Sequence, residues 1–252
     1  MTSVPNVAPL LEVDHASLGY GNGVVVNEVS LTVAPGDAIG IAGESGSGKS
    51  TLAKGLIGDI APLSGSIRIL GKSWADVGRR DPDRRRVQMV FQDPYSALNP
   101  RMTGRQTVTE VLRVTRGLDR KEARFVAEDL LVSVGLSGSA MDLRPQRLSG
   151  GMRQWVVLAR AMASDPEVLI ADEPTSALDV SIQAQILDLL IALRAEMGLA
   201  LVLVTHDLAV LKHMTDRTLI MRQGFVVEDG PTTEILENPQ HEYTRALVAA
   251  QS

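Results

Sequence analysis

The amino-acid sequence predicts an α/β domain with a mainly parallel sheet and an all-helical insertion. Three observations support this fold class. Short apolar strands alternate with amphipathic helices along most of the chain, which is typical of parallel sheets covered on both faces. The segment 96–145 instead shows only helical periodicity and contains no strand candidate. Apolar residues make up 44% of the 252 residues, which suffices for a full hydrophobic core.

Before the insertion, strand candidates alternate with one helix. Val24–Val33 alternates apolar and polar residues like a half-buried strand, and the turn "PGD" follows it. Three further strands are expected in the short apolar runs "AIGIAG", "SIRIL" and "RVQMVFQ". The segment Lys49–Ile60 is expected to be the helix.

Past Pro145 the alternation of helices and strands resumes. Helices are expected at Met152–Ala163 and Leu208–Met214, and the runs "EVLIAD" and "LALVLVT" are expected to be buried strands. A long helix lies between these strands, and "RTLIMRQG" with "FVVEDG" predicts a final hairpin. The apolar face of the long helix is expected to contain Ile182, Ile186, Leu189, Leu190, Leu193 and Met197.

Composition excludes several classes of protein. The chain has no cysteine, so disulfides, thiolate metal sites and iron–sulfur clusters are excluded. Lys plus Arg number 25 against 30 Asp plus Glu, a net charge of −5 that argues against a dedicated nucleic-acid binder. The start "MTSVPNVAPLLEVDH" lacks the pattern of a secretory signal, and no apolar run approaches the length of a membrane span. We therefore expect a soluble, cytoplasmic protein.

The stretch "GESGSGKST" follows the strand candidate "AIGIAG" directly and opens the helix predicted from Lys49. It matches G-x-x-x-x-G-K-[ST], in which glycines let backbone N–H groups converge and the helix start adds its positive dipole end. The lysine reaches the β- and γ-phosphates and Ser50 ligates Mg²⁺. The alternative interpretation, a flexible Gly/Ser turn without a ligand, does not account for the strand before the stretch and the helix after it. The stretch therefore predicts a nucleoside triphosphate site formed by Gly43, Glu44, Ser45, Gly46, Ser47, Gly48, Lys49, Ser50 and Thr51.

Two acidic residues end the buried strand "VLIAD" and begin the loop after it. Asp172 is predicted to bind the metal, directly or through water, and Glu173 to orient or deprotonate the attacking water. Ordinary strand-end acids are the alternative for this pair taken alone. Small GTPases, kinases, helicases and transport ATPases all remain compatible with these two motifs.

The segment "RLSGGMRQWVVLARAMASDP" places Ser149, Gly150 and Gly151 immediately before a predicted helix. This is a second helix start suited to an anion. Ser149 could merely cap the helix, but capping explains two glycines poorly. One domain with a single glycine-rich lysine loop ("GESGSGKST") has little use for another phosphate contact on its own nucleotide. We therefore expect the helix start at Ser149 to contact the nucleotide of a second subunit.

With these motifs in order, the sequence resembles the ATP-binding-cassette (ABC) family over nearly its whole length. "LSGGM" resembles the family signature, although Met152 stands where Gln is usual. Tyr20 in "LGYGNG" corresponds to the aromatic residue that stacks on adenine. Gln92 in "VFQDP" corresponds to the glutamine that touches metal and water. "SALD", ending in Asp179, resembles the loop at the dimer interface, and His206 in "VTHD" the histidine that contacts the γ-phosphate.

The resemblance implies one domain over residues 1–252. Its RecA-like P-loop NTPase core, with an N-terminal antiparallel β subdomain, spans about 1–95 and 146–252. A helical subdomain spans about 96–145 and continues into the signature helix. ATP and Mg²⁺ are the implied cofactors. Two ATPase subunits face head to tail, so that each ATP lies between the lysine loop of one and the "LSGG" of the other.

The family assigns roles to individual positions. Lys49, Gln92, Glu173 and His206 are the expected catalytic residues, and Ser50, Gln92 and Asp172 the expected metal ligands. Ser149, Gly150, Gly151, Asp179 and Tyr20 are expected to contact nucleotide. Three of these residues have a simpler alternative: Tyr20 could be an exposed turn residue, Gln92 a strand-end polar group, and His206 a structural or exposed histidine.

Two stretches, "FQDPYSALNPRMT" and "ENPQHEYTRALVAA", resemble the peptide, opine and nickel importer subfamily. The implied protein lies at the cytoplasmic face of the membrane. Its implied partners are separate permease subunits, a second ABC ATPase of the same or a related kind, and a solute-binding protein reached through the permease; no nucleic acid is expected. The arginine cluster "RRDPDRRR" at 79–86 is expected to be a solvated loop partly neutralised by Asp81 and Asp83, with a nucleic-acid or anionic-lipid contact as the alternative. Trp155 has no explanation from the sequence.

Three rival functions remain open. An ABC-type ATPase could serve a soluble complex, as in phosphonate breakdown. A nucleic-acid-linked ATPase would need a second cassette or very long coiled coils, whereas Lys49 and Ser149 are only 100 residues apart. A GTPase would need the guanine-reading motif N-K-x-D, which the sequence lacks, and neither a GTPase nor a small-molecule kinase explains "LSGG" or His206.

Overall fold

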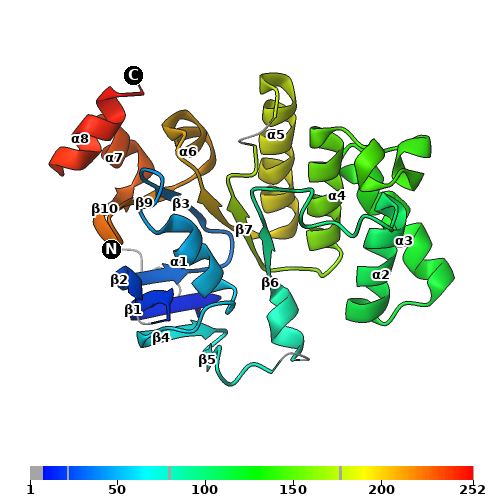
Figure 1. Cartoon of the computed structure of the whole chain (residues 1–252), viewed down its shortest axis with the longest axis horizontal. Helices are drawn as coiled ribbons and strands as arrows, with labels where there is room; N and C mark the ends of the chain where they lie inside the picture. The colour runs from blue at the N-terminus through cyan, green and yellow to red at the C-terminus, as the bar shows by residue number, and fades with distance from the viewer. Residues whose placement is uncertain (1–7, 22, 79–80, 176–177, 252) are drawn as a thin grey trace, which may run out of the picture. The chain divides into compact units, whose positions relative to one another are not determined.

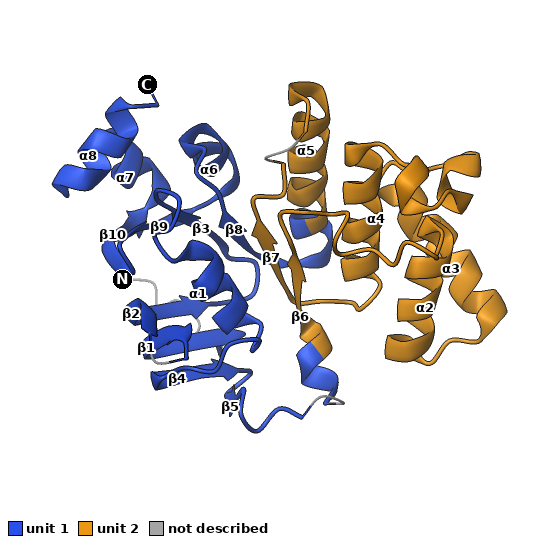
Figure 2. Ribbon diagram, viewed as in Figure 1, with its two compact units in different colours: residues 1–84, 194–252 blue, residues 85–193 orange. Residues whose placement is uncertain are grey.

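The structure is a computed structural model that describes residues 8–21, 23–78, 81–175 and 178–251 (Figure 1). The chain forms two compact units (Figure 2). Unit 1 comprises residues 1–84 and 194–252, and unit 2 comprises residues 85–193. Part of the arginine cluster (79–80) and part of "SALD" (176–177) lie outside the described residues.

One sheet of unit 1 is antiparallel and has the strand order β2-β1-β4-β5, which confirms the expected N-terminal β subdomain. Its strands are β1 (Leu11–Tyr20), β2 (Gly23–Val33), β4 (Ser64–Ile69) and β5 (Lys72–Ser73). Sequence periodicity did not predict β1. The reason is a bulge: the pairing register with β2 shifts between Val13 and Ala16, and His15 adopts a positive φ of 43°. The bulge interrupts the two-residue alternation that identifies a strand.

The second group of strands in unit 1 has the order β10-β9-β3-β8. Its members are β3 (Ala38–Ala42), β8 (Ala200–Val204), β9 (Arg217–Arg222) and β10 (Phe225–Pro231). Strand β3 pairs in parallel with both β8 and β9, and every residue of β3 and β8 is buried. Strands β9 and β10 form the predicted antiparallel hairpin. The parallel character predicted for this part of the sheet is therefore confirmed.

Four helices belong to unit 1: α1 (Lys49–Leu56), α6 (Leu208–Met214), α7 (Thr232–Glu237) and α8 (Glu242–Ala249). Helix α1 ends four residues before the expected Ile60. Gly58 adopts a φ of 73°, which L-residues with a side chain rarely adopt, and an added Cβ there would lie 2.7 Å from the Trp74 ring. The chain must turn at this glycine to accommodate the indole. Helices α7 and α8 were not predicted.

Unit 2 contains the parallel strands β6 (Val87–Val90) and β7 (Val168–Asp172) and most of the remaining helices. These helices are α2 (Gly104–Arg116), α3 (Arg120–Ser133), α4 (Gly150–Met162) and α5 (Val180–Met197), whose last residues belong to unit 1. Short 3₁₀ helices of unit 2 lie at Gly138–Asp142 (η2) and Pro145–Arg147 (η3), and a further one at Pro82–Arg86 (η1) begins in unit 1 and ends in unit 2. No strand occurs in residues 96–145, so the helical insertion is confirmed; its exact subdomain boundaries stay a prediction.

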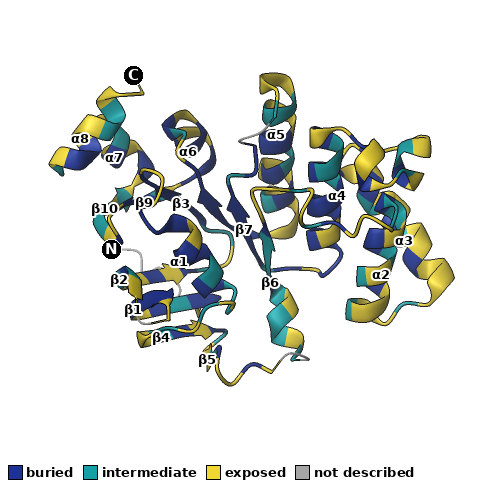
Figure 3. Ribbon diagram, viewed as in Figure 1, coloured by how far each residue is buried: buried dark blue, intermediate teal, exposed yellow. Residues whose placement is uncertain are grey.

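Local signals fix the helix starts in the insertion. Thr103 and Gln106 form a reciprocal capping box at α2, and Asp119 and Glu122 form another at α3. Figure 3 shows that buried residues follow one side of these helices. Trp155 of α4 lies against Gly135, where an added Cβ would be 3.5 Å from the indole. This contact supplies the account of Trp155 that the sequence alone did not.

Helix α5 buries only part of its expected apolar face, and it also buries Leu187, which lies outside that face. Ile186, Leu190 and Leu193 are buried, whereas Met197 is 42% exposed at the last residue of the helix. Gly198 follows it with a φ of 64°, typical of a helix C-terminus. No helix within the described ranges is long and apolar enough to span a membrane.

Arg105 ties the three parts of the insertion together. Its guanidinium forms a two-bond contact with Asp142 of η2, at 3.0 and 3.2 Å, and also pairs with Glu128 of α3. This hydrogen bonding holds the pKa of Asp142 below its usual value. A carboxyl group whose pKa is lower in the folded state than in the unfolded state stabilises the folded state. This stabilisation is complete when the pH is above the unfolded pKa of about 4, and it is lost as the pH falls through the folded pKa.

We therefore predict that Asp142→Asn destabilises the chain at pH 7 but not at pH 2–3. Because Asp142 is half exposed, the effect at pH 7 should be at most about 1 kcal/mol. Urea unfolding of both chains across this pH range measures it. A destabilisation of the same size at every pH would show that the loss is one of packing rather than of charge.

Candidate functional site

The lysine loop of unit 1 connects β3 to α1 and spans residues 43–48. Its Gly43, Gly46 and Gly48 have positive φ values of 146°, 81° and 104°. Gly48 occupies the N-cap of α1 without a side-chain cap, so the first N–H groups of the helix have no side-chain acceptor at that position. Lys49 is buried, and its Nζ donates to the carbonyl oxygens of Gly43 and Glu44 at 2.7 and 2.8 Å. The ammonium group therefore lies across the loop.

Packing and an unsatisfied hydroxyl distinguish this loop. A Cβ added at Gly43 would lie 2.1 Å from the Met221 carbonyl oxygen, so the close approach of the loop to β9 requires glycine there. The Oγ of Ser47 is buried and has no hydrogen-bond partner among the described residues. A buried hydroxyl without a partner is costly, and an oxygen-rich ligand would satisfy it. Ser50, in the first turn of α1, is exposed.

The His206 loop lies at the same end of the sheet as the lysine loop. Strands β3 and β8 are parallel neighbours with Ile41 opposite Val204, and the Thr205 N–H donates to the Ile41 carbonyl at 3.2 Å. The carboxyl ends of both strands therefore carry candidate residues, as expected of ligand sites in open α/β sheets. His206 is exposed, and Asp207 caps α6 directly after it.

Tyr20 is the last residue of β1 and is 53% exposed. It is followed by Gly21, which has a φ of 57°. An aromatic side chain held at a strand end and open to solvent has a free face for a nucleobase. Its adenine contact stays a prediction.

Sequence reasoning missed the C-terminal helix α8 and the contacts that it and the following Gln251 make with the two loops of unit 1. The Tyr243 Oη is buried and accepts a hydrogen bond from the Glu44 N–H at 3.0 Å. Gln251 donates to the His206 carbonyl at 2.8 Å and accepts from the Leu208 N–H at 3.0 Å. No local pattern reveals a contact between residues 199 positions apart. The only available signal was an aromatic residue within the tail "HEYTRAL".

Arg222 completes the surroundings of this tyrosine, with its guanidinium 4.9 Å from the centroid of the Tyr243 ring. Burial is the main cause that raises the pKa of Tyr243, so the phenol keeps its proton at neutral pH. The hydroxyl accepts from the loop while the ring packs beside the cation. Tyr243 thus fixes the peptide N–H of Glu44 within the lysine loop.

We predict that Tyr243→Phe weakens nucleotide binding by a few-fold while leaving the fold intact. Phenylalanine keeps the ring and its contact with Arg222 but leaves the Glu44 N–H without its acceptor, a loss of about 1 kcal/mol. Titration with a fluorescent ATP analogue measures the affinity, and thermal unfolding checks the fold. The control is Tyr95→Phe, in unit 2, which should bind the ATP analogue with wild-type affinity. If Tyr243→Phe also bound the analogue with wild-type affinity, the hydrogen bond from the Glu44 N–H to Tyr243 would not contribute to nucleotide binding.

In unit 2, Gln92 and Glu173 form a hydrogen bond that the sequence did not predict. Strands β6 and β7 are parallel neighbours with Val90 opposite Ala171, so the residues just beyond their carboxyl ends are adjacent. The Gln92 Nε2 donates to the Glu173 Oε2 at 2.8 Å. Asp172, the last residue of β7, is 6% exposed.

Glu173 also has an uncommon backbone conformation, with a φ of 45°. A non-glycine residue with this φ is strained, and such strain concentrates at functional sites. The carboxylate is only partly buried, and Gln92 is exposed. The pair can therefore be reached by a water molecule.

A hydrogen-bonded turn fixes the chain directly after Gln92. The Asp93 carboxylate accepts from the Tyr95 and Ser96 N–H groups at 2.9 and 3.2 Å. The Arg153 guanidinium of α4 stacks 5.1 Å from the Tyr95 ring centroid. The glutamine loop is thereby connected to the helix that carries the "LSGG" motif.

The "LSGG" segment begins α4. Ser149 is the N-cap, and its Oγ accepts from the Met152 N–H at 3.2 Å, so the capping alternative is confirmed for the serine. A Cβ on Gly151 would lie 2.5 Å from Ile182, so close packing against α5 explains this glycine. Packing does not explain Gly150, which is exposed and would meet only the end of the Leu178 side chain, at 3.2 Å. Asp179, one residue before α5, is also exposed.

No cluster of three or more His, Asp or Glu side chains suited to a metal occurs among the residues that the structure describes. Mg²⁺ in nucleotide sites is held by one or two protein ligands together with phosphate oxygens, so such a cluster is not required. Ser50 of unit 1 and Asp172 of unit 2 each carry an oxygen of the kind that Mg²⁺ prefers, so the chemistry of each residue fits a magnesium ligand. That the two residues hold one Mg²⁺ together stays a prediction.

Comparison with known proteins supports these motifs. A family profile described as "ABC transporter" matches residues 26–176. A probable peptide ABC transporter ATP-binding protein of Sinorhizobium fredii is 46% identical over 227 residues, which cover 89% of this chain and 64% of that protein. The oligopeptide transport ATP-binding protein of Escherichia coli is 43% identical over 231 residues, covering 89% of this chain and 68% of that protein.

A solved structure agrees with the fold class. The dimeric structure of a post-hydrolysis state of an ATP-binding cassette bound to ADP and Pi has a TM-score of 0.80 at 29% identity, and it covers 88% of this chain and 98% of that one. The α/β architecture with an antiparallel β subdomain and helical insertion is therefore confirmed as that of a cassette ATPase.

Proposed function

The chain belongs to the ABC transporter family, and from this premise we propose that it is the ATP-hydrolysing subunit of a membrane importer for peptides. The lysine loop is the observation that carries the proposal. Its glycine-only path, its buried Lys49 ammonium and its buried Ser47 hydroxyl together form a pocket for phosphate oxygens. The α1 N-terminus adds N–H donors to it.

In the proposed reaction, residues of the chain position phosphate and move one proton. Lys49 stabilises the charge of the β- and γ-phosphates, and His206 contacts the γ-phosphate. Glu173 accepts a proton from the attacking water, which Gln92 helps to orient. The water oxygen bonds to the γ-phosphorus while the bond from that phosphorus to the bridging oxygen breaks, so ADP leaves. Tyr20 stacks on adenine. Mg²⁺, held by Ser50, Gln92 and Asp172, would neutralise negative charge on the phosphates.

We further propose that each nucleotide is contacted by two subunits. Gly150 is exposed at the start of α4 and no neighbour requires it to be a glycine, which supports close approach by a ligand from outside the chain. Ser149 and Asp179 are exposed next to α4 and α5. These residues then complete the site of a partner ATPase, identical or related. The dimeric cassette with bound ADP and Pi is consistent with this arrangement.

The remaining proposals concern the assembly. The ATPase acts on separate permease subunits at the cytoplasmic face of the membrane and, through them, on a solute-binding protein. Peptides are the proposed cargo because the relatives are named for peptide and oligopeptide transport; nickel and metal–opine complexes are the other cargoes of the subfamily that the sequence resembles. The rival is an ABC-type ATPase of a soluble enzyme complex.

Affinity purification from detergent-solubilised membranes separates these two functions. The proposal predicts recovery of a multi-span permease with the chain and stimulation of ATP hydrolysis by a peptide-loaded binding protein in proteoliposomes. Recovery with soluble enzymes alone, in a preparation that still hydrolyses ATP, would establish the rival. Failure to hydrolyse ATP under any condition would contradict both.

A further inference from the structure

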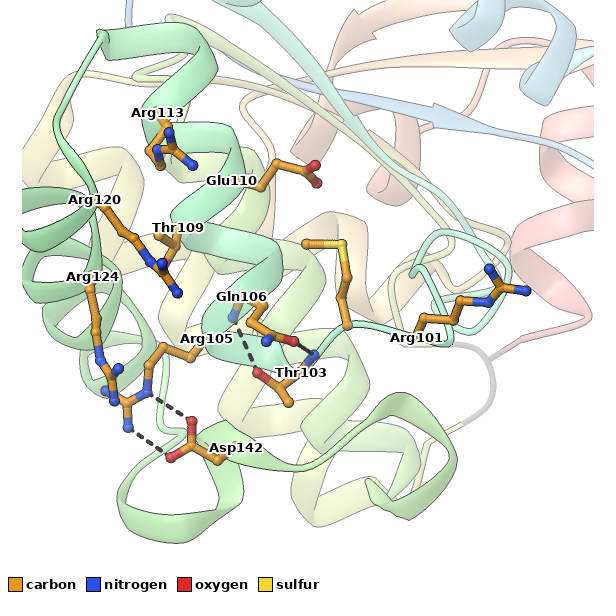
Figure 4. A pocket seen from close by; sticks show the side chains of 11 residues that line it. Arg101, Thr103, Arg105, Gln106, Thr109, Glu110, Arg113, Arg120, Arg124 and Asp142 are labelled. Carbon is orange, nitrogen blue, oxygen red and sulfur yellow. Dashed lines mark hydrogen bonds and ion pairs between the residues drawn. The ribbon is translucent and has the colours of Figure 1, made fainter.

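A basic cavity lies in the helical insertion, apart from every residue assigned to the nucleotide (Figure 4). Its volume is about 530 Å³, within the range of small-molecule sites. Residues 101–103, helices α2 and α3 and the last residue of η2 line it with five arginines and only two carboxylates. The arginines are Arg101, Arg105, Arg113, Arg120 and Arg124, and the carboxylates are Glu110 and Asp142.

Existing ion pairs account for only part of this charge. Arg105 is neutralised by Asp142 and Glu128, and Arg124 lies near enough to Asp142 to lower the pKa of that carboxyl further. Arg101, Arg113 and Arg120 form no salt bridge within the described part of the chain. Figure 4 shows Arg113 and Arg120 above the Arg105–Asp142 pair, on the same side of the cavity.

A solvated helix surface usually intersperses charges of both signs, and the chain as a whole has a net charge of −5. Several guanidinium groups around one concave surface repel one another within a Debye length of about 8–10 Å. The same concavity concentrates their field and attracts anions. Arginine binds phosphate and carboxylate through paired, geometrically matched hydrogen bonds.

We propose that this cavity binds a small anion that carries two or more phosphate or carboxylate groups. Arg113 and Arg120 bind its charged groups from α2 and α3. Arg105, already fixed by Asp142 and Glu128, forms a rigid wall beneath them. The site is separate from the lysine loop and does not depend on ATP hydrolysis or on the cargo.

Calorimetric titration with pyrophosphate and, separately, with citrate tests the proposal. The full chain carrying Lys49→Ala is used, because that change weakens phosphate binding at the lysine loop. We expect saturable binding of one anion per chain that weakens at higher salt. Binding of pyrophosphate alone would assign a phosphate ligand, and binding of citrate alone a carboxylate ligand.

A double variant locates the site. Arg113→Gln with Arg120→Gln should weaken binding by about tenfold or more, since two charge-assisted contacts are lost. The control, Lys54→Gln with Lys121→Gln, removes the same net charge outside the cavity and should change the affinity less than about twofold. The proposal is overturned if neither anion binds, if both double variants bind alike, or if the chain binds only vesicles of anionic lipid. Thermal unfolding of each variant confirms that it is folded.

Discussion

Replacing Glu173 with Gln is expected to reduce ATP turnover by at least about 100-fold, the usual contribution of a positioned general base. The amide keeps an oxygen that can accept from Gln92, so the 2.8 Å contact and the local packing can persist. What is lost is the ability to take a proton from water. Phosphate release measures turnover, and a fluorescent ATP analogue should show affinity equal to or tighter than wild type.

The matched control for this variant is Glu167→Gln. Glu167 lies in the same chain segment, just before β7, and pairs with Arg86 on the surface far along the strand from Glu173. The Glu167→Gln substitution removes the same charge from the same unit as Glu173→Gln does. Wild-type turnover in Glu173→Gln would end its assignment as the base, whereas loss of turnover in both variants would indicate a general effect of charge.

Lys49→Ala is expected to weaken ATP binding by at least about tenfold, or about 1.4 kcal/mol. The buried ammonium bridges the Gly43 and Glu44 carbonyls, and its removal takes away both the positive charge and the contact that shapes the loop. Titration with the fluorescent analogue gives the affinity.

Lys54→Ala is the control for this second variant. Lys54 lies in the last turn of the same helix, where it is away from the lysine loop. The Lys54→Ala variant should bind ATP with the affinity of the wild type. If Lys49→Ala bound nucleotide and hydrolysed it at the wild-type rate, the lysine loop would not be the phosphate site.

The sequence predicted the parts of the fold in which local periodicity matches the structure. Buried runs such as "AIGIA" and "VLIAD" became the fully buried strands β3 and β7, and Leu208–Met214 was predicted to the residue. Strand β1 was missed because a bulge breaks its alternation. Helix α1 was predicted too long because its end depends on the distant Trp74, whose contact with Gly58 no local pattern encodes.

The candidate site follows the same division. Motifs that lie within one loop, such as the lysine loop and the Asp172–Glu173 pair, were visible in the sequence. The Gln92–Glu173 hydrogen bond was not predicted, because it depends on the pairing of β6 with β7, which no local pattern shows. Tyr243 was not visible because its contact with the loop is long-range. Conversely, the two glycines of "LSGG" had looked equivalent, and only the structure separates Gly151, which packs on Ile182, from the exposed Gly150.

The central claim is that one subunit completes the catalytic site of another, and mixing two inactive variants tests it most directly. Gly150→Arg places bulk at the exposed start of α4 without removing its Ser149 cap. Lys49→Ala disables the lysine loop. Neither variant alone should hydrolyse ATP, but an equimolar mixture should recover about a quarter of the wild-type rate, since half of the dimers then contain one intact site out of two. Full hydrolysis by Gly150→Arg alone, at a size shown to be monomeric during turnover, would contradict the account.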